Sequence, residues 1–450
     1  MATLLARNAE RLVTMDGTRR EIAGGGLFAR DGMIEQVGPS DSLPRDADEV
    51  IDLSGHVVVP GLVNTHHHLY QNLTRAVPAA QDALLFGWLR ALYPVWARMV
   101  PDDIRVSATV GLAELALSGC TTSADHLYLF PNGSRLDDEI EAALEIGLRL
   151  HATRGAMSIG ESAGGLPPDS LVEPEARILK DCERVVGAFH DSRPGAMVRI
   201  ALAPCSPFSV SRELMRDTAL LARKLGVMLH THLAENEEDV AYSRAQFGCR
   251  PGLYAEQLGW TGDDVWHAHA VRLDAGEIDL FARSGTGVAH CPCSNMRLGS
   301  GIAPVRRMRD AGVKVGLGVD GSASNDAADL LNEARQAMLL QRVALGADAM
   351  SAREALEIAT LGGARTLGRD DLGSLERGKR ADFAAFAIAG PGMAGAWDPV
   401  AALVLCAPGK ANYTVVEGRV VVREGRLETI DLEAALRQHR ARTRRLVDGA

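Results

Sequence analysis

The chain has 450 residues, of which 46% are hydrophobic and 24% charged, and its net charge at pH 7 is −10. This is the composition of a globular protein, and the acidic balance together with 4% aromatic residues argues against a nucleic-acid partner. No run of about 18 apolar residues occurs, so we expect no membrane span. The seven scattered cysteines are an odd number, which argues against a disulfide framework and predicts a cytoplasmic protein.

Short strands with tight turns are expected at both ends of the chain. Residues 27–37 are apolar on both sides of an Asp-Gly turn, a hairpin signal. Residues 381–386 and 413–422 repeat this pattern near the other end. Such strands are too few and too short to be stable separately. We therefore predict one small composite β-sandwich domain from residues 1–58 plus 368–428.

Residues 59–367 alternate short apolar strands with amphipathic helices. Strands are expected at Leu62–His68, Thr121–Asp125, Leu150–Ala156, Val198–Pro204, Val227–His232, Val265–His269, Gly287–Cys291 and Val315–Asp320. Eight strands with intervening helices predict an α/β fold, a distorted (β/α)8 TIM barrel. The alternative, an open doubly wound sheet, would need a glycine-rich turn after its first strand, where this chain has histidines. Residues 429–450 are expected to form a basic helical tail docked on the body.

Residues of metal-ligand type end several of the expected strands. His66 and His68 end the first, His232 the fifth and Asp320 the eighth. Side chains two apart on a strand point to the same side, and the carboxyl ends of barrel strands share one face. We therefore expect these four groups to hold one divalent metal, zinc or iron, with a water position left open. Such a metal lowers the pKa of its water from about 16 to roughly 7–9.

Hydrolysis also needs groups that carry protons. Glu235 lies three residues after His232 and is a candidate proton carrier, while Asp320 could accept the proton of the water. His269, which ends the sixth expected strand, could orient the water or stabilise charge. His230, on the same strand face as His232 but one layer deeper, is a candidate partner for a ligand.

These residues together resemble the amidohydrolase superfamily. The resemblance rests on the segments 60–68 and 232–235 with His269 and Asp320, and it indicates the mononuclear aminohydrolase branch. It covers nearly the whole chain and implies the fold, the ligands and the roles given above. Two-metal barrels of this kind carry a carboxylated lysine at the end of strand four. Residues 203–208 contain no lysine, so a single metal is expected.

The substrate is suggested by the residues that follow the first histidines. Residues 68–82 resemble the members of this branch that deaminate 8-oxoguanine, and the triazine hydrolases share a looser form. The side chain of Gln71 offers a donor and an acceptor, which suits the amide edge of an oxidised purine. Further substrate-binding candidates are Tyr70, Trp88, His126 and Asn295.

The resemblance thus implies a hydrolase acting on C–N bonds of cyclic amidines, converting 8-oxoguanine to urate and ammonia. Alternatives are guanine, isocytosine, a pterin, or a triazine that loses an amine or chloride. An alternative of another class is a non-catalytic scaffold. Such relatives typically lose ligands, whereas every ligand position is filled in this chain. The expected partners are a small heterocyclic substrate and further copies of the chain in a homo-oligomer.

Overall fold

A closed barrel of parallel strands forms the centre of the computed structural model, which describes residues 2–448. Its strands are β8 (Leu62–Asn64), β9 (Cys120–Leu127), β10 (Arg149–Ala156), β11 (Val198–Pro204), β12 (Met228–Leu233), β13 (Val265–His269), β14 (Gly287–His290) and β15 (Lys314–Leu317). They pair in the order β10-β11-β12-β13-β14-β15-β8-β9. Every residue of β9 and β10 is buried, as expected of parallel strands covered on both faces. The predicted distorted (β/α)8 barrel is confirmed.

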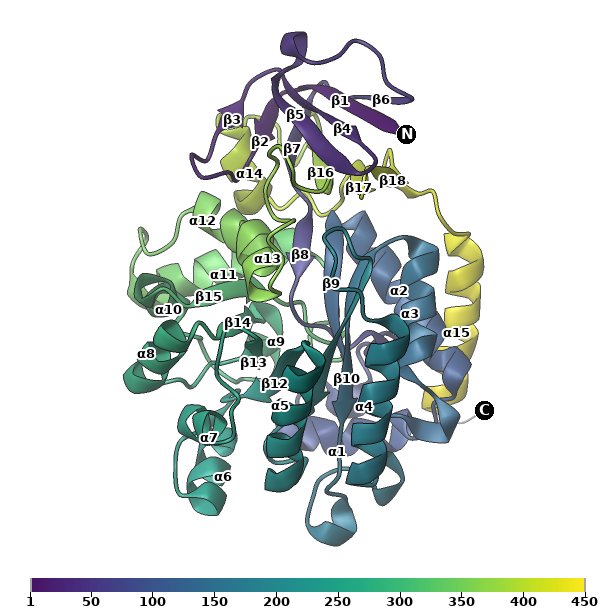
Figure 1. Ribbon diagram of the computed structural model, residues 1–450, viewed down its shortest axis with the longest axis vertical. Coiled ribbons are helices and arrows are strands. Elements are labelled where there is room, and N and C mark those ends of the chain that lie inside the picture. The colour runs from purple at the N-terminus through teal and green to yellow at the C-terminus, as the bar shows by residue number, and fades with distance from the viewer. Residues whose placement is uncertain (1, 449–450) are drawn as a thin grey trace.

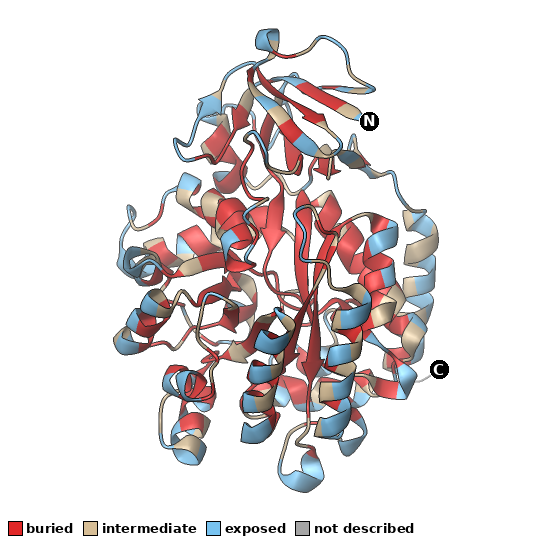
Figure 2. Ribbon diagram, viewed as in Figure 1, coloured by how far each residue is buried: buried red, intermediate tan, exposed pale blue. Residues whose placement is uncertain are grey.

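Helices surround this barrel and turn exposed faces outward, whereas the barrel strands are largely buried (Figures 1 and 2). The helices are α1 (Leu85–Trp96), α2 (Pro101–Leu117), α3 (Leu136–Ile146), α4 (Glu175–Phe189), α5 (Arg212–Leu225), α6 (Glu237–Phe247), α7 (Pro251–Gln257), α8 (Ala275–Ser284), α9 (Pro292–Arg297), α10 (Val305–Ala311), α11 (Leu330–Leu345), α12 (Ala352–Glu357), α13 (Gly363–Thr366), α14 (Pro399–Leu405) and α15 (Leu432–Asp448). A 3₁₀ segment, η2 (Leu69–Thr74), follows β8, and a π-helical segment, η7 (Ile358–Gly362), joins α12 to α13. None of the helices in the described range is long and apolar enough to cross a membrane.

Two smaller sheets lie at the top of Figure 1, above the barrel and its ring of helices. One has the order β5-β4-β1-β6, made of β1 (Thr3–Ala9), β4 (Gly25–Arg30), β5 (Met33–Pro39) and β6 (Glu49–Asp52). The other has the order β19-β18-β17-β16-β7-β2-β3, made of β2 (Arg11–Val13), β3 (Glu21–Ile22), β7 (His56–Pro60), β16 (Phe383–Ala387), β17 (Tyr413–Val416), β18 (Arg419–Arg423) and β19 (Arg426–Leu427).

The two sheets pack against each other through one apolar core. Leu27 and Ile51 of the first sheet share a buried cluster with Val58 and Phe383 of the second. Because the second sheet combines strands from both ends of the chain, this is the composite sandwich that the sequence predicts. The division into residues 1–58 plus 368–428, 59–367 and 429–450 remains a prediction.

The chain crosses from the sandwich to the barrel at Gly61. The apolar run before the histidines is divided between two strands, β7 and β8. β7 pairs with β16 in the sandwich, whereas β8 pairs with β9 in the barrel. A Cβ on Gly61 would lie 2.0 Å from Oγ1 of Thr121, so only glycine fits at the crossing. The strand predicted at Leu62–His68 therefore ends at Asn64, and the histidines follow it.

Two helices outside the regular alternation frame the lower half of the molecule. Helix α1 lies across the carboxyl end of the barrel, at the bottom of Figure 1, and α15 runs beside α2. Arg442 of α15 donates to the buried carboxylate of Asp103 in α2 at 3.0 Å. The described part of the predicted helical tail thus docks on the body, and its residues 449–450 lie outside the described residues.

Candidate active site

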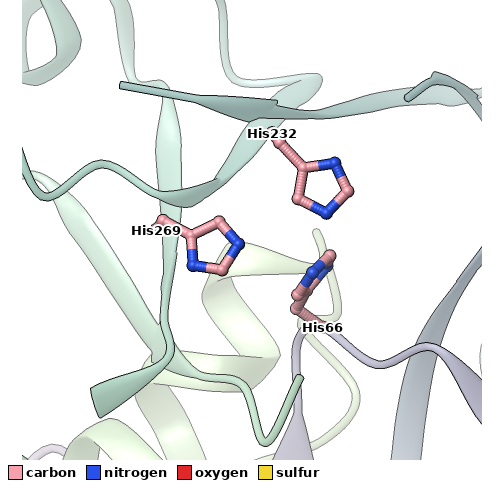
Figure 3. Close-up of side chains that lie close together, drawn as sticks. All are labelled: His66, His232 and His269. Atoms are coloured by element: carbon pink, nitrogen blue, oxygen red, sulfur yellow. The ribbon is translucent and has the colours of Figure 1, made fainter. Parts of the chain in front are cut away.

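Four donor atoms from three regions of the chain converge at the carboxyl end of the barrel. The Nε2 atoms of His68 and His232 lie 3.1 Å apart. Oδ1 of Asp320 is 3.4 Å from Nε2 of His66 and 3.3 Å from Nε2 of His68. Figure 3 shows the rings of His66 and His232 directed toward a common space, which the ring of His269 also approaches. The structure therefore brings together the groups predicted as ligands.

Backbone carbonyls orient two of these imidazoles. Nδ1 of His68 donates to the carbonyl oxygen of His126 at 2.7 Å, and Nδ1 of His232 donates to that of Cys205 at 2.6 Å. A carbonyl can only accept, so each ring carries its proton on Nδ1. The lone pair of each Nε2 atom then faces the shared space, which is the tautomer that a metal ligand needs.

The third imidazole, that of His66, is oriented by a hydrogen bond to a second ring, that of His230. Nδ1 of His230 donates to the carbonyl oxygen of Trp266 at 2.9 Å, which leaves Nε2 of His230 as an acceptor. Nδ1 of His66 lies 2.8 Å from that Nε2 and donates to it. The remaining Nε2 of His66 is buried and has no hydrogen-bond partner within residues 2–448. His230 is therefore placed one layer behind the ligand, as its position on the strand predicts.

This donor set fits a divalent metal. Two neutral imidazoles with lone pairs facing each other at 3.1 Å repel unless a cation lies between them, and a buried acceptor without a partner is costly. Burial lowers the pKa of His66 and of His68, and it lowers the pKa of His232 to about 3. All three rings are thus held neutral, as metal coordination requires.

Left-handed backbone conformations aim two of the groups into the site. His269 has φ of 69° and Asp320 has φ of 62°. Such values are uncommon outside glycine and collect at functional sites, where the surroundings enforce them. Both residues lie where the chain leaves a barrel strand, so the sharp turn directs their side chains into the barrel mouth.

The candidate proton carriers lie beside the donors. Nε2 of His269 is 3.7 Å from Oε2 of Glu235 and 3.9 Å from Oδ2 of Asp320. Burial raises the pKa of Glu235 to about 7, which suits a group that gains and loses a proton near neutral pH. Burial opposes ionisation of Asp320, but its 3.4 Å contact with Nε2 of His66 and the charge of His269 hold its pKa well below the ordinary value.

One pocket opens onto these groups. It is lined by His68, Gln71, Leu85, Trp88, Leu89, Tyr93, Tyr128, Cys205, Ser206, Phe208, His232, Glu235, His269, Leu298, Asp320 and Ser324. Of the predicted substrate-binding residues, Gln71 and Trp88 line it. Tyr70, His126 and Asn295 do not: His126 lies inside β9, within the cluster of imidazoles, and Asn295 contacts His269.

Sequence reasoning missed most of the pocket wall. Helix α1 supplies Leu85, Leu89 and Tyr93 in addition to Trp88. These residues do not follow an expected strand, so the strand ends gave no signal for them. Cys205 and Ser324 follow β11 and the end of β15. The rule that site residues follow barrel strands could have indicated these two.

Three comparisons relate the chain to known proteins. Residues 57–421 match the family model described as the amidohydrolase family. The chain is 46% identical over 452 residues to 8-oxoguanine deaminase from Pseudomonas aeruginosa, covering 100% of both proteins. It is 40% identical over 416 residues to isoxanthopterin deaminase from an unknown prokaryotic organism, covering 87% of this chain and 86% of that protein.

A solved structure agrees with these relatives. The crystal structure of atrazine chlorohydrolase from Arthrobacter aurescens TC1 complexed with zinc matches with a TM-score of 0.94 and 37% identity. The match covers 99% of this chain and 100% of that one. The family model spans most of the chain, and the sequence relatives extend over nearly all of it. This chain belongs to the amidohydrolase family.

Proposed function

We propose that this chain is a metal-dependent deaminase that converts 8-oxoguanine and water to urate and ammonia. The observation that carries the proposal is Oε1 of Gln71, which is buried and has no hydrogen-bond partner in the described chain. Gln71 lines the same pocket as His68, His232 and Glu235. A buried acceptor of this kind supports recognition of a ring N–H beside the reacting carbon. The 46% identity to an 8-oxoguanine deaminase over the whole chain supports this choice of heterocycle.

The ligand set we propose is His66, His68, His232 and Asp320, with zinc as the metal. A zinc ion held there would supply Lewis-acid activation of the attacking water. The choice of zinc is supported by the zinc in the matching chlorohydrolase structure.

Three side chains then transfer protons or orient the water during hydrolysis. Asp320 accepts a proton from the attacking water and later delivers one to the leaving amine. Glu235 protonates the ring nitrogen beside the amine-bearing carbon and recovers a proton from the hydroxyl of the adduct as the amine leaves. Its raised pKa, about 7, suits that exchange. His269 lies between the two carboxylates and orients the water toward the ring.

The side chain of Gln71 holds the ring in place. Its Nε2 donates to the hydroxyl of Tyr70 at 3.3 Å, so the amide is oriented with Oε1 available to a substrate N–H. Trp88 closes the wall beside it and is itself held by a 3.0 Å hydrogen bond from Nε1 to the carbonyl oxygen of Ala323. Tyr70 therefore acts behind Gln71 in this proposal.

A second candidate is a triazine hydrolase, which would release an amine or chloride. It is favoured by the TM-score of 0.94 to the atrazine chlorohydrolase and by the apolar side chains of Leu85, Leu89 and Leu298 in the pocket. An apolar wall suits alkyl substituents, whereas the free acceptor of Gln71 suits an oxopurine.

A substrate panel tests the proposal. The purified protein, loaded with zinc or ferrous iron, is given 8-oxoguanine, guanine, isocytosine, isoxanthopterin and chlorotriazines, and ammonia and chloride are measured. We expect the highest kcat/KM for 8-oxoguanine, with ammonia and urate formed in equal amounts. Chloride from chlorotriazines without ammonia from any purine would overturn the proposal. A homo-oligomer located in the cytoplasm remains a prediction.

A further inference from the structure

Two adjacent residues of α9 reach two different acid–base groups of the site. Oγ of Ser294 donates to Oδ2 of Asp320 at 2.5 Å. Oδ1 of Asn295 accepts from Nδ1 of His269 at 2.9 Å. Both α9 side chains are fully buried, and neither lines the pocket. They therefore lie behind the groups that face a substrate.

The amide of Asn295 determines which nitrogen of His269 faces the pocket. An oxygen acceptor at Nδ1 requires the ring proton there. Nε2 of His269 is then the atom directed at Glu235 and Asp320, at 3.7 and 3.9 Å. Without the acceptor, nothing would hold a proton at Nδ1 or fix the ring, and Nε2 would no longer be directed consistently at the two carboxylates.

The hydroxyl of Ser294 determines which oxygen of Asp320 faces the histidines. Oδ2 receives hydrogen bonds from Ser294 and, at 3.2 Å, from Oγ of Ser324. Oδ1 is left toward Nε2 of His66 and of His68. The carboxylate is thus held with Oδ1 at the donor cluster and with Oδ2 at the two hydroxyl groups, 3.9 Å from Nε2 of His269.

The short helix that carries both residues is itself anchored. Oε2 of the buried Glu333 accepts from the backbone N–H of Cys293 at 3.2 Å, and Oε1 accepts from Nδ2 of Asn325 at 2.8 Å. Asn325 also donates to the carbonyl oxygen of Val319 at 2.7 Å. The first turn of α9 is therefore fixed against the loop that carries Asp320.

We infer that Ser294 and Asn295 are positioning residues, which set the atoms that His269 and Asp320 present to the reaction. The inference rests on the proposed function for its kinetic consequences, but the proton on Nδ1 of His269 does not depend on any substrate. It also replaces the prediction that Asn295 binds substrate: a substrate contact would change KM, whereas a positioning residue changes kcat.

The kinetic test compares variants of matched shape. Asn295→Asp keeps an acceptor at Nδ1, and Asn295→Leu keeps the volume without an acceptor. We expect Asn295→Leu to lose about 10- to 100-fold in kcat, with KM and bound zinc unchanged within about twofold, and Asn295→Asp to recover most of the loss. Ser294→Ala should lower kcat and Ser294→Thr should restore it. Met296→Ala, on the exposed side of the same helix, is the control and should leave kcat unchanged.

A second measurement needs no turnover. Nitrogen-15 NMR of histidine-labelled, zinc-loaded protein reports the protonated nitrogen of His269, assigned with His269→Gln. We expect Nδ1 of His269 to be protonated in the parent and in Asn295→Asp, and to lack its proton in part of the molecules of Asn295→Leu. An unprotonated Nδ1 in the parent, with equal losses in Asn295→Asp and Asn295→Leu, would overturn the inference. Absence of 8-oxoguanine turnover with Nδ1 protonated as expected would overturn the proposed function alone.

Discussion

Gly321 leaves space for the side chain of Gln71, which is proposed to bind the substrate. A Cβ added there would lie 1.8 Å from Oε1, 2.3 Å from Cδ and 2.9 Å from Nε2 of Gln71. An ordinary contact begins at 3.4 Å, so the amide oxygen must move by about 1.6 Å in Gly321→Ala. The backbone of Gly321 is outside the left-handed region, and alanine keeps the N–H that donates to Oδ1 of Asp320 at 2.8 Å. The change should therefore displace Gln71 and leave Asp320 in place.

The expected cost is that of one displaced hydrogen bond to the substrate, about 1–3 kcal/mol, or roughly 5- to 150-fold in kcat/KM. Ammonia release from 8-oxoguanine measures kcat/KM, element analysis measures bound zinc, and calorimetry measures Tm. We expect bound zinc to stay constant and Tm to fall only slightly, because the clash involves the end of one side chain.

A double-mutant cycle with Gln71→Ala isolates this effect. Once the long side chain is absent, Gly321→Ala has nothing to displace, so it should change kcat/KM by less than about twofold. An equal loss from Gly321→Ala in both backgrounds would refute the reasoning, as would a parallel loss of zinc.

Three further outcomes are expected. Glu235→Gln should retain zinc and lose about 10²- to 10⁴-fold in kcat; normal turnover would remove Glu235 from its role as proton carrier. His230→Leu leaves Nδ1 of His66 without its acceptor and should weaken zinc binding by about 10- to 100-fold in a chelator competition. The control is His190→Leu, at a partly exposed histidine outside the pocket, which should leave zinc binding unchanged. Chelation should lower Tm, because a metal at 100 times its Kd stabilises a folded protein by about 2.7 kcal/mol; an unchanged Tm after verified metal removal would contradict binding to the folded state alone.

The positions of the proposed metal ligands were predictable, because the strand ends of the fold carry residues with metal-binding side chains. Only the carboxyl end of a barrel brings together residues as distant in sequence as His66, His232 and Asp320. A period of two also places His66 and His68 on one side. This holds although both residues lie beyond β8, because single backbone hydrogen bonds extend the pairing past the end of the strand. The N–H of Asp320 donates to the carbonyl oxygen of His66, and the N–H of His126 donates to that of His67.

Other features depend on contacts that local sequence does not encode. Helix α1 has no side-chain cap at its start and contains Pro94 near its end, which are poor helix signals. It is held instead by distant contacts, such as the hydrogen bond from Trp88 to Ala323. Likewise, the sequence predicted that Asn295 binds substrate, but only packing decides that its amide contacts His269 rather than the pocket.

The proposed metal ligand His68 and the proposed substrate contact Gln71 are held in place by the same strand. His68 is anchored through Nδ1 by the carbonyl of His126, and the next N–H, that of Leu69, donates to Oδ1 of the buried Asp125 at 2.6 Å. Both anchors belong to β9, and η2 carries Gln71 only three residues after His68. Because a rigid strand fixes the start of η2, the backbone of Gln71 cannot move relative to the donor cluster without breaking one of these bonds. Substrate position is therefore set by the same strand that orients the ligand, and changes at Asp125 should disturb KM and metal binding together.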